Sequence, residues 1–173
     1  MSIERLRALL RAIVEQPLPY STSATEIERG LWVGPTPTLE DVPELVSMRV
    51  ALVIDCTASA ASRFLDDIGL AAARMHCPMA DDVERQNERC EEAMGLCIKA
   101  AAAALRKNRT VLVHCRSGVY CAPSIAYGAL RWNGATMIEA TSSVARRTYA
   151  IPRYIENTER IVMRFQPPSA WNP

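Results

Sequence analysis

The sequence lacks an excess of charge of either sign. Its 20 lysines and arginines are balanced by 19 aspartates and glutamates, which leaves a formal net charge of +1. A chain so close to neutral has no overall basic field that could hold nucleic acid or an anionic membrane surface. We therefore expect neither nucleic acid nor a membrane as a partner, and any bound anion must be held by a local site.

Long hydrophobic runs are missing as well. The apolar stretch 3–14 is interrupted by Glu4 and Arg7, so it lacks the core of a secretory signal. The alanine-rich stretch around Ala100 is too short to span a bilayer and ends at Arg106. The C-terminal residues form no prenylation motif. These absences together predict a cytoplasmic protein.

The spacing of metal ligands is absent too. The cysteines contain no Cys-x-x-Cys pair, and the only histidines are His76 and His114. The sequence therefore predicts no metal and no organic cofactor. In a reducing compartment most of the six cysteines should be small, buried apolar residues. They are Cys56, Cys77, Cys90, Cys97, Cys115 and Cys121.

What the sequence does contain is an alternation of strand-like and helix-like segments. The continuous, β-branched runs 50–54 and 110–114 are typical of buried strands. Weaker patterns fill the rest. They predict a short strand or hairpin at 27–33, a strand at 73–78, and helices at 39–48, 86–107, 123–132, 136–147 and 152–165. The alternation predicts an α/β fold with a central, mostly parallel, twisted sheet of about 4–5 strands and helices on both faces.

The length of 173 residues suits one compact domain. Residues 2–15 repeat apolar positions at helical spacing, and two prolines follow at Pro17 and Pro19. We therefore expect an N-terminal helical extension over residues 1–22 and the domain itself over residues 23–173.

The segment that carries the predicted chemistry runs from Val111 to Ser124. A buried strand delivers Cys115 into a short loop, and a helix is expected to begin at Pro123, a favourable first helical position. Backbone N–H groups in such a loop can converge on an anion, and the helix dipole adds positive potential. A thiolate there would be placed for phosphoryl transfer. A structural cysteine buried after the strand is the alternative.

This segment, from His114 to Cys121, resembles the signature loop of the Cys-dependent protein tyrosine phosphatases. In that family His-Cys is followed by five residues and then Arg. The resemblance is best for the dual-specificity branch, and it extends to four other segments. These are 27–34, 53–57, 78–82 and 138–152.

The resemblance implies a role for each matched residue. Cys115 would be the nucleophile that forms a phosphocysteine, on a phosphorylated protein or another phosphate ester. Asp82 would be the general acid, with Asp81 as the alternative, and His114 would orient the loop. The phosphate would lie against the loop residues Arg116, Ser117, Gly118, Val119, Tyr120 and Cys121.

The sequence departs from the family pattern at Cys121, which stands where the family has arginine. A guanidinium group binds two phosphate oxygens at once and keeps its charge at any pH, and a thiol does neither. Tyr120 also replaces a small residue, so its ring must turn either into the pocket or out to solvent. Among other arginines, Arg131 is not placed to substitute, whereas Arg85 or Arg89 could reach the loop.

The departure predicts a pseudophosphatase, which binds phosphorylated protein with little or no turnover. Two alternatives stay open. One is a slow but active tyrosine and serine/threonine phosphatase that works through Cys115. The other is a redox-sensitive site in which Cys115 forms a disulfide with Cys121 or Cys56. The oligomeric state is not predicted.

Overall fold

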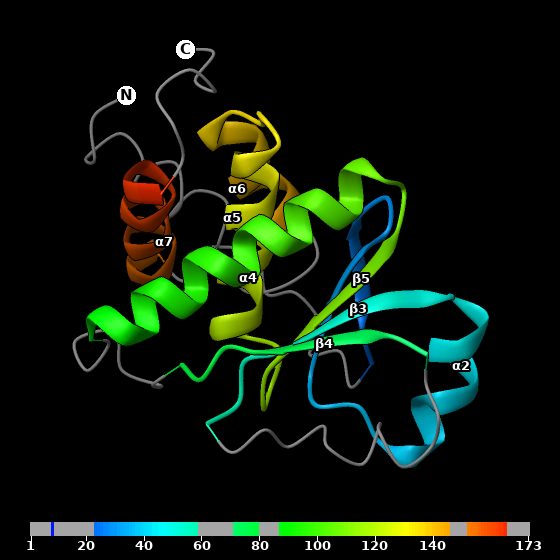
Figure 1. Cartoon of the computed structure of the whole chain (residues 1–173). Coiled ribbons are helices and arrows are strands. Elements are labelled where there is room, and N and C mark those ends of the chain that lie inside the picture. Colours follow the sequence, from blue (N-terminus) through cyan, green and yellow to red (C-terminus); the bar gives the residue numbers. More distant parts are fainter. Residues whose placement is uncertain (1–7, 9–22, 59–70, 80–86, 146–151, 166–173) are drawn as a thin grey trace.

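The computed structural model describes residues 8, 23–58, 71–79, 87–145 and 152–165. Within them, a single five-stranded sheet has helices on both faces (Figure 1). The expected N-terminal extension lies outside the described residues, except for Ala8, and stays a prediction.

The sheet has the strand order β1-β2-β5-β3-β4. Its strands are β1 Thr25–Glu28, β2 Leu31–Gly34, β3 Val50–Asp55, β4 Ala73–His76 and β5 Thr110–His114. The β1–β2 pair is an antiparallel hairpin, and the other three pairs are parallel. Parallel strands need crossover segments, which cover the faces of the sheet. The predicted mostly parallel α/β fold is therefore confirmed.

Helices lie on both sides of this sheet (Figure 1). One side carries α4 Glu88–Arg106, α5 Cys121–Trp132, α6 Met137–Ala145 and α7 Pro152–Phe165. The other side carries a short 3-10 turn, η1 Leu39–Asp41, and α2 Val42–Ser47. None of the helices in the described part of the chain is both long and apolar enough to cross a membrane.

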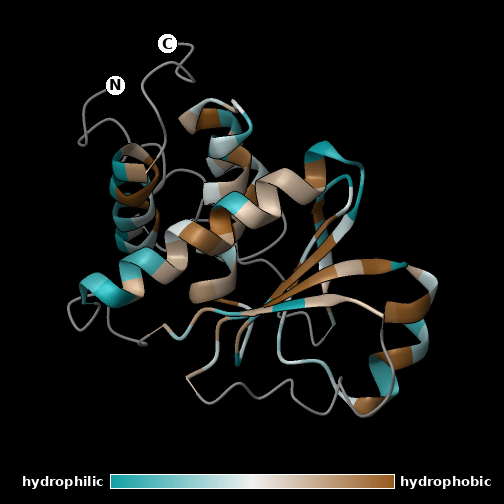
Figure 2. Ribbon diagram, in the orientation of Figure 1, coloured by the Kyte–Doolittle hydropathy of each residue, from teal (hydrophilic) through white to brown (hydrophobic). Residues whose placement is uncertain are grey.

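The central strand β5 contributes to a core on each face. Val111 and Val113 belong to the large core shared with α4 and α5, whereas Leu112 belongs to the smaller core shared with α2. This alternation follows from the two-residue period of a strand. Figure 2 shows the consequence, because the central strands are coloured hydrophobic and the exposed start of α4 is coloured hydrophilic.

Helix α5 begins two residues earlier than predicted. It starts at Cys121, so Pro123 is its third residue rather than its first. Proline is tolerated there because the first N–H groups of a helix have no partner within the helix. The correction matters for the site, since it makes Cys121 part of the helix and shortens the preceding loop.

Candidate active site

The loop that joins β5 to α5 is fixed at its start by the neighbouring strand β2. The Cys115 N–H donates a hydrogen bond of 3.3 Å to the Gly34 carbonyl oxygen. The Thr36 hydroxyl donates a bond of 3.4 Å to the carbonyl oxygen of Cys115. Cys115 itself is only 4% exposed and belongs to the large core. Both backbone polar groups of Cys115, the N–H and the carbonyl oxygen, are therefore bonded to the segment 34–36.

Gly118 sits where the loop lies close to the end of β2. Its φ angle is +72°, and a Cβ atom at this position would lie 2.7 Å from the carbonyl carbon of Gly34. Backbone with positive φ strongly favours glycine, and no side-chain atom fits at such a distance. Gly118 thus allows the loop to turn tightly between the end of β2 and the start of α5.

The loop ends at the N-terminus of α5. Tyr120 occupies the N-cap position, and its side chain makes no capping hydrogen bond. The Ser124 hydroxyl donates to the Tyr120 carbonyl oxygen at 3.1 Å instead. The N–H groups of Cys121 and Ala122 carry the positive end of the helix dipole, as an anion site requires.

Cys121 lies inside the molecule at the first position of α5. It is 3% exposed and belongs to the same core as Cys115. Arg116, by contrast, is exposed on the outer side of the loop, and Ser117 and Val119 are half-buried. The loop therefore presents no cationic side chain at the position where the family resemblance requires one.

The ring of Tyr120 turns outward rather than into the core. It is 42% exposed, and its centroid lies 5.9 Å from that of Tyr154 on α7. The guanidinium carbon of Arg153 lies 5.4 Å from the centroid of Tyr154. The question that the sequence left open about Tyr120 is thus answered, and its ring extends the outer rim of the loop.

His114 is fully buried next to the carboxylate of Asp55. Its Nε2 lies 3.9 Å from Asp55 Oδ2, and neither ring nitrogen hydrogen-bonds to a residue that the structure describes. Burial lowers the pKa of His114 to about 4, and Arg74 adds to this effect while Asp55 opposes it. The other Asp55 oxygen accepts bonds from the Thr57 N–H at 2.8 Å and the Thr57 hydroxyl at 2.6 Å. His114 is therefore neutral at pH 7.

Other buried cysteines belong to the same core as Cys115. Cys56 and Cys77 follow the paired ends of β3 and β4, and the thiol of Cys77 hydrogen-bonds both Cys56 and Cys97. The bond from Cys77 favours the Cys56 thiolate, but burial and the nearby thiols of Cys115 and Cys121 raise the pKa of Cys56 to about 11. None of the six cysteines is in a disulfide. A redox role for Cys115 stays a prediction.

The structure tests the expectation for Arg131 but not the one for the general acid. Arg131 is held away from the loop by Glu159 on α7, with Nη2 and Oε1 2.7 Å apart. This agrees with the expectation that Arg131 does not serve the loop. Asp82 and its alternative Asp81 lie outside the described residues, so the general acid stays a prediction.

Some features of the site carried no signal in the sequence. The contact of Thr36 with Cys115 joins residues 79 positions apart. Cys56, Cys77 and Cys97 lie close together in the core. Their proximity depends on the register of β3 and β4 and on which face of α4 is buried. Such contacts follow from tertiary packing, and no local motif marks them.

A buried parallel strand, a loop that begins at Cys115 and the start of helix α5 together form the candidate site of this α/β protein. No protein-family model matches the sequence, and no curated protein is significantly similar to it. Solved structures do match its fold. The crystal structure of PTPMT1 has a TM-score of 0.70 and 16% identity, and the match covers 87% of this chain and 100% of that one.

Two human structures match to a similar degree. Human DUSP28 has a TM-score of 0.66 and 16% identity, with 88% of this chain and 98% of that chain covered. The human tyrosine phosphatase-like serine/threonine/tyrosine-interacting protein has a TM-score of 0.67 and 15% identity, with coverages of 84% and 99%. The chain therefore has the fold of the dual-specificity phosphatases.

Proposed function

We propose that the chain is a pseudophosphatase, which holds a phosphate ester or a phosphorylated protein in the loop from Cys115 to Cys121 with little or no turnover. The observation that carries this proposal is Cys121. Its side chain is buried at the start of α5, at the position where the phosphatase family that the chain resembles has a phosphate-binding arginine. A neutral thiol in that place supplies no charge to the transferring group.

The missing charge decides between binding and catalysis. Preorganised donors in a water-excluded site stabilise the charge that develops in the transition state, and loss of one costs about 3 kcal/mol or more. Such a loss corresponds to a rate about a hundredfold lower, or lower still. Ground-state binding depends less on this single group, because backbone N–H groups at the start of α5 also contribute.

The comparisons support a phosphorylated ligand. One matching structure is PTPMT1 in complex with PI(5)P, and another protein with this fold is named as a phosphatase-like interacting protein. The fold thus occurs both with a bound phosphoinositide and in a protein named for an interaction. For this chain, phosphorylated protein or another phosphate ester is the proposed partner.

The proposal predicts that Cys121→Arg gains activity. We expect hydrolysis of a small aryl phosphate to rise at least a hundredfold over the unmodified protein, because arginine restores the missing charge. Cys121→Met is the matched control, since it adds a long neutral side chain at the same buried position. Cys115→Ser is the blank that identifies turnover through the proposed nucleophile.

The same experiment separates the alternative of a slow active phosphatase. Turnover by the unmodified protein that disappears in Cys115→Ser would favour an enzyme and overturn the pseudophosphatase proposal. A gain in Cys121→Met equal to that in Cys121→Arg would show that side-chain size, not charge, limits the site.

A further inference from the structure

Three arginines stand in a row at the end of the sheet opposite the Cys115 loop. Arg29 precedes β2, Arg109 precedes β5 and Arg49 precedes β3. These three strands are neighbours in the sheet and run parallel, with β5 in the middle. All three arginines therefore lie at the same end of the sheet.

The strand pairing brings the three residues to neighbouring positions at this end of the sheet. Leu31 pairs with Val111 of β5 and with Glu28 of β1, so Arg29 lies in the hairpin turn before β2, and it lines one hollow together with Arg109. Val50 pairs with Thr110, so Arg49 stands opposite Arg109 on its other side.

The arginine row has no protein counter-ion among the described residues. All three side chains are exposed, and none forms an ion pair with another described residue. Two carboxylates of β1, one of which (Glu26) lines the same hollow, bond to backbone. Glu26 accepts from the Gly30 N–H at 2.9 Å, and Glu28 accepts from the Arg29 N–H at 3.4 Å. Like charges that lie close together repel, so a bound anion would reduce the repulsion among the three arginines.

One member of the row occupies a strained backbone position. Arg49 has a φ angle of +52°, in the left-handed region that glycine and asparagine adopt most easily. In the turn before Arg109, the corresponding left-handed residue is Asn108, with φ +53°. The turn before β3 thus carries a charged side chain at a position where glycine would be less strained.

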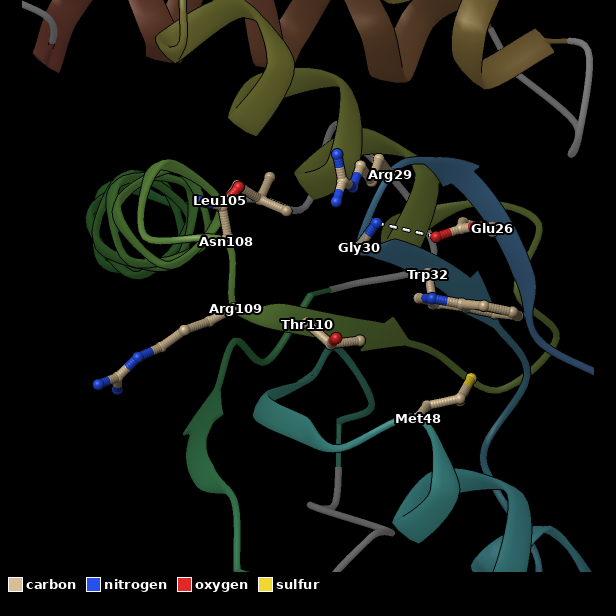
Figure 3. Close-up of a pocket in the computed structure, with 9 residues that line it drawn as sticks. All are labelled: Glu26, Arg29, Gly30, Trp32, Met48, Leu105, Asn108, Arg109 and Thr110. Atoms are coloured by element: carbon tan, nitrogen blue, oxygen red, sulfur yellow. Dashed lines mark hydrogen bonds between the residues drawn. The ribbon is translucent and has the colours of Figure 1, made fainter.

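A hollow of about 310 Å³ opens at the same end of the sheet, and Arg29 and Arg109 line it (Figure 3). Trp32 and Leu105 supply apolar surface, and Thr110 supplies a hydroxyl. In Figure 3 the guanidinium group of Arg29 is turned toward Leu105, whereas the side chain of Arg109 extends away from the hollow. The volume is at the small end of the range for small-molecule sites.

We propose that the arginine row, Arg29, Arg49 and Arg109, binds a small molecule that carries two or more phosphate groups, either free or as the headgroup of a lipid. Guanidinium groups bind phosphate through paired hydrogen bonds. Neighbouring arginines can each take one phosphate group, and the hollow beside Trp32 takes the scaffold that joins them. A row this short, on a chain of net charge +1, suits a compact polyanion rather than a long nucleic acid.

The test uses inositol hexakisphosphate as the free probe and phosphatidylcholine vesicles with phosphatidylinositol bisphosphate as the lipid probe. Calorimetry should show that Arg109→Gln and Arg49→Gly each bind the free probe about tenfold more weakly than the parent protein. Lys99→Gln is the matched control, because it removes one exposed charge of α4 outside the row. Arg49→Gly should be at least as stable to heat as the parent, which excludes unfolding as the cause.

Vesicle binding with the same dependence on Arg109 and Arg49 would identify a lipid headgroup as the source, and binding of the free probe alone would identify a soluble ligand. Equal affinity of Arg109→Gln, Arg49→Gly and Lys99→Gln would overturn the site, as would failure of the parent to bind either probe. The row shares no residue with the Cys115 loop, so this result is independent of the proposed pseudophosphatase function.

Discussion

At the scale of single residues, Gly118 is constrained twice, by its positive φ angle and by its contact with Gly34. Gly134 offers a matched comparison, because its φ angle is +95° but no atom lies within 4 Å of an added Cβ. We expect Gly134→Ala to cost about 1 kcal/mol of unfolding free energy, from backbone strain alone. Gly118→Ala should cost about 2 kcal/mol or more, because the clash with backbone adds to that strain.

Chemical denaturation of the two alanine variants measures this difference. The parent protein is the reference, and the slope of each transition checks that the unfolded states are comparable. Equal losses at Gly118 and Gly134 would mean that the loop can move away from β2, and the fixed geometry assigned to the loop would then be wrong.

His114 makes the stability of the fold depend on pH. The unfolded histidine binds a proton below about pH 6.5, whereas burial lowers the pKa of the folded one to about 4. Between these values the unfolded state binds more protons, so stability is lost as the pH falls from 6.5 to 4. The full loss from this residue is about 3 kcal/mol.

The measurement is urea unfolding of the parent and of His114→Gln at several pH values between 7 and 4. Both proteins keep the same carboxylates, so the parent, which alone has the buried histidine, should lose more stability than the variant over this range. Parallel curves would contradict a buried neutral histidine at position 114.

The residues of the site differ in how far the sequence determines them. The placement of Cys115 in a loop between a buried strand and a helix follows from local pattern, and it was predicted. The outward direction of the Tyr120 ring was not, because it depends on Tyr154 some 34 positions later on α7. The proximity of Asp55 to His114 likewise required the pairing of β3 with β5.

At the scale of elements, α5 and α7 are joined by a buried ion pair. Arg131 and Glu159 have side chains that are 11% and 6% exposed, and the Tyr127 hydroxyl also donates to Glu159 at 2.7 Å. We expect Arg131→Met to cost about 3 kcal/mol, since it leaves a buried carboxylate without its cation. Thermal or chemical unfolding measures the loss.

The control for this prediction is the exposed pair of Arg160 with Glu91. The side chain of Arg160 is 69% exposed, so Arg160→Met should cost less than about 1 kcal/mol. If both variants lose the same stability, the packing of α5 against α7 does not depend on the charge of Arg131.

The elements themselves were mostly predictable, and their ends were less so. The strands at 50–54 and 110–114 appear as β3 and β5 because their apolar, β-branched runs are buried on both faces. The start of α5 was misplaced at Pro123, since proline is common at the first position of a helix but is also allowed at the third. The helix therefore begins at a residue with no local start signal, Cys121.

At the scale of the whole molecule, the alternation of strands and helices predicted a mostly parallel sheet, but it did not fix the strand order. β5 lies between β2 and β3 although it follows both in the sequence. Only this insertion brings Gly34 and Cys56 beside the end of β5, and it also brings Arg29, Arg49 and Arg109 to the same end of the sheet. The candidate site and the arginine row thus depend on topology that no local pattern specifies.

The central position of β5 has a consequence for the time scale of motion at the loop. Because β5 pairs with β2 on one side and β3 on the other, its N–H groups can exchange with solvent deuterium only when the sheet itself opens. The loop that begins at Cys115 is attached to this slowly opening strand. Deuterium uptake in β5 should therefore be as slow as global unfolding, and Cys115 keeps its place through the faster local openings of the molecule.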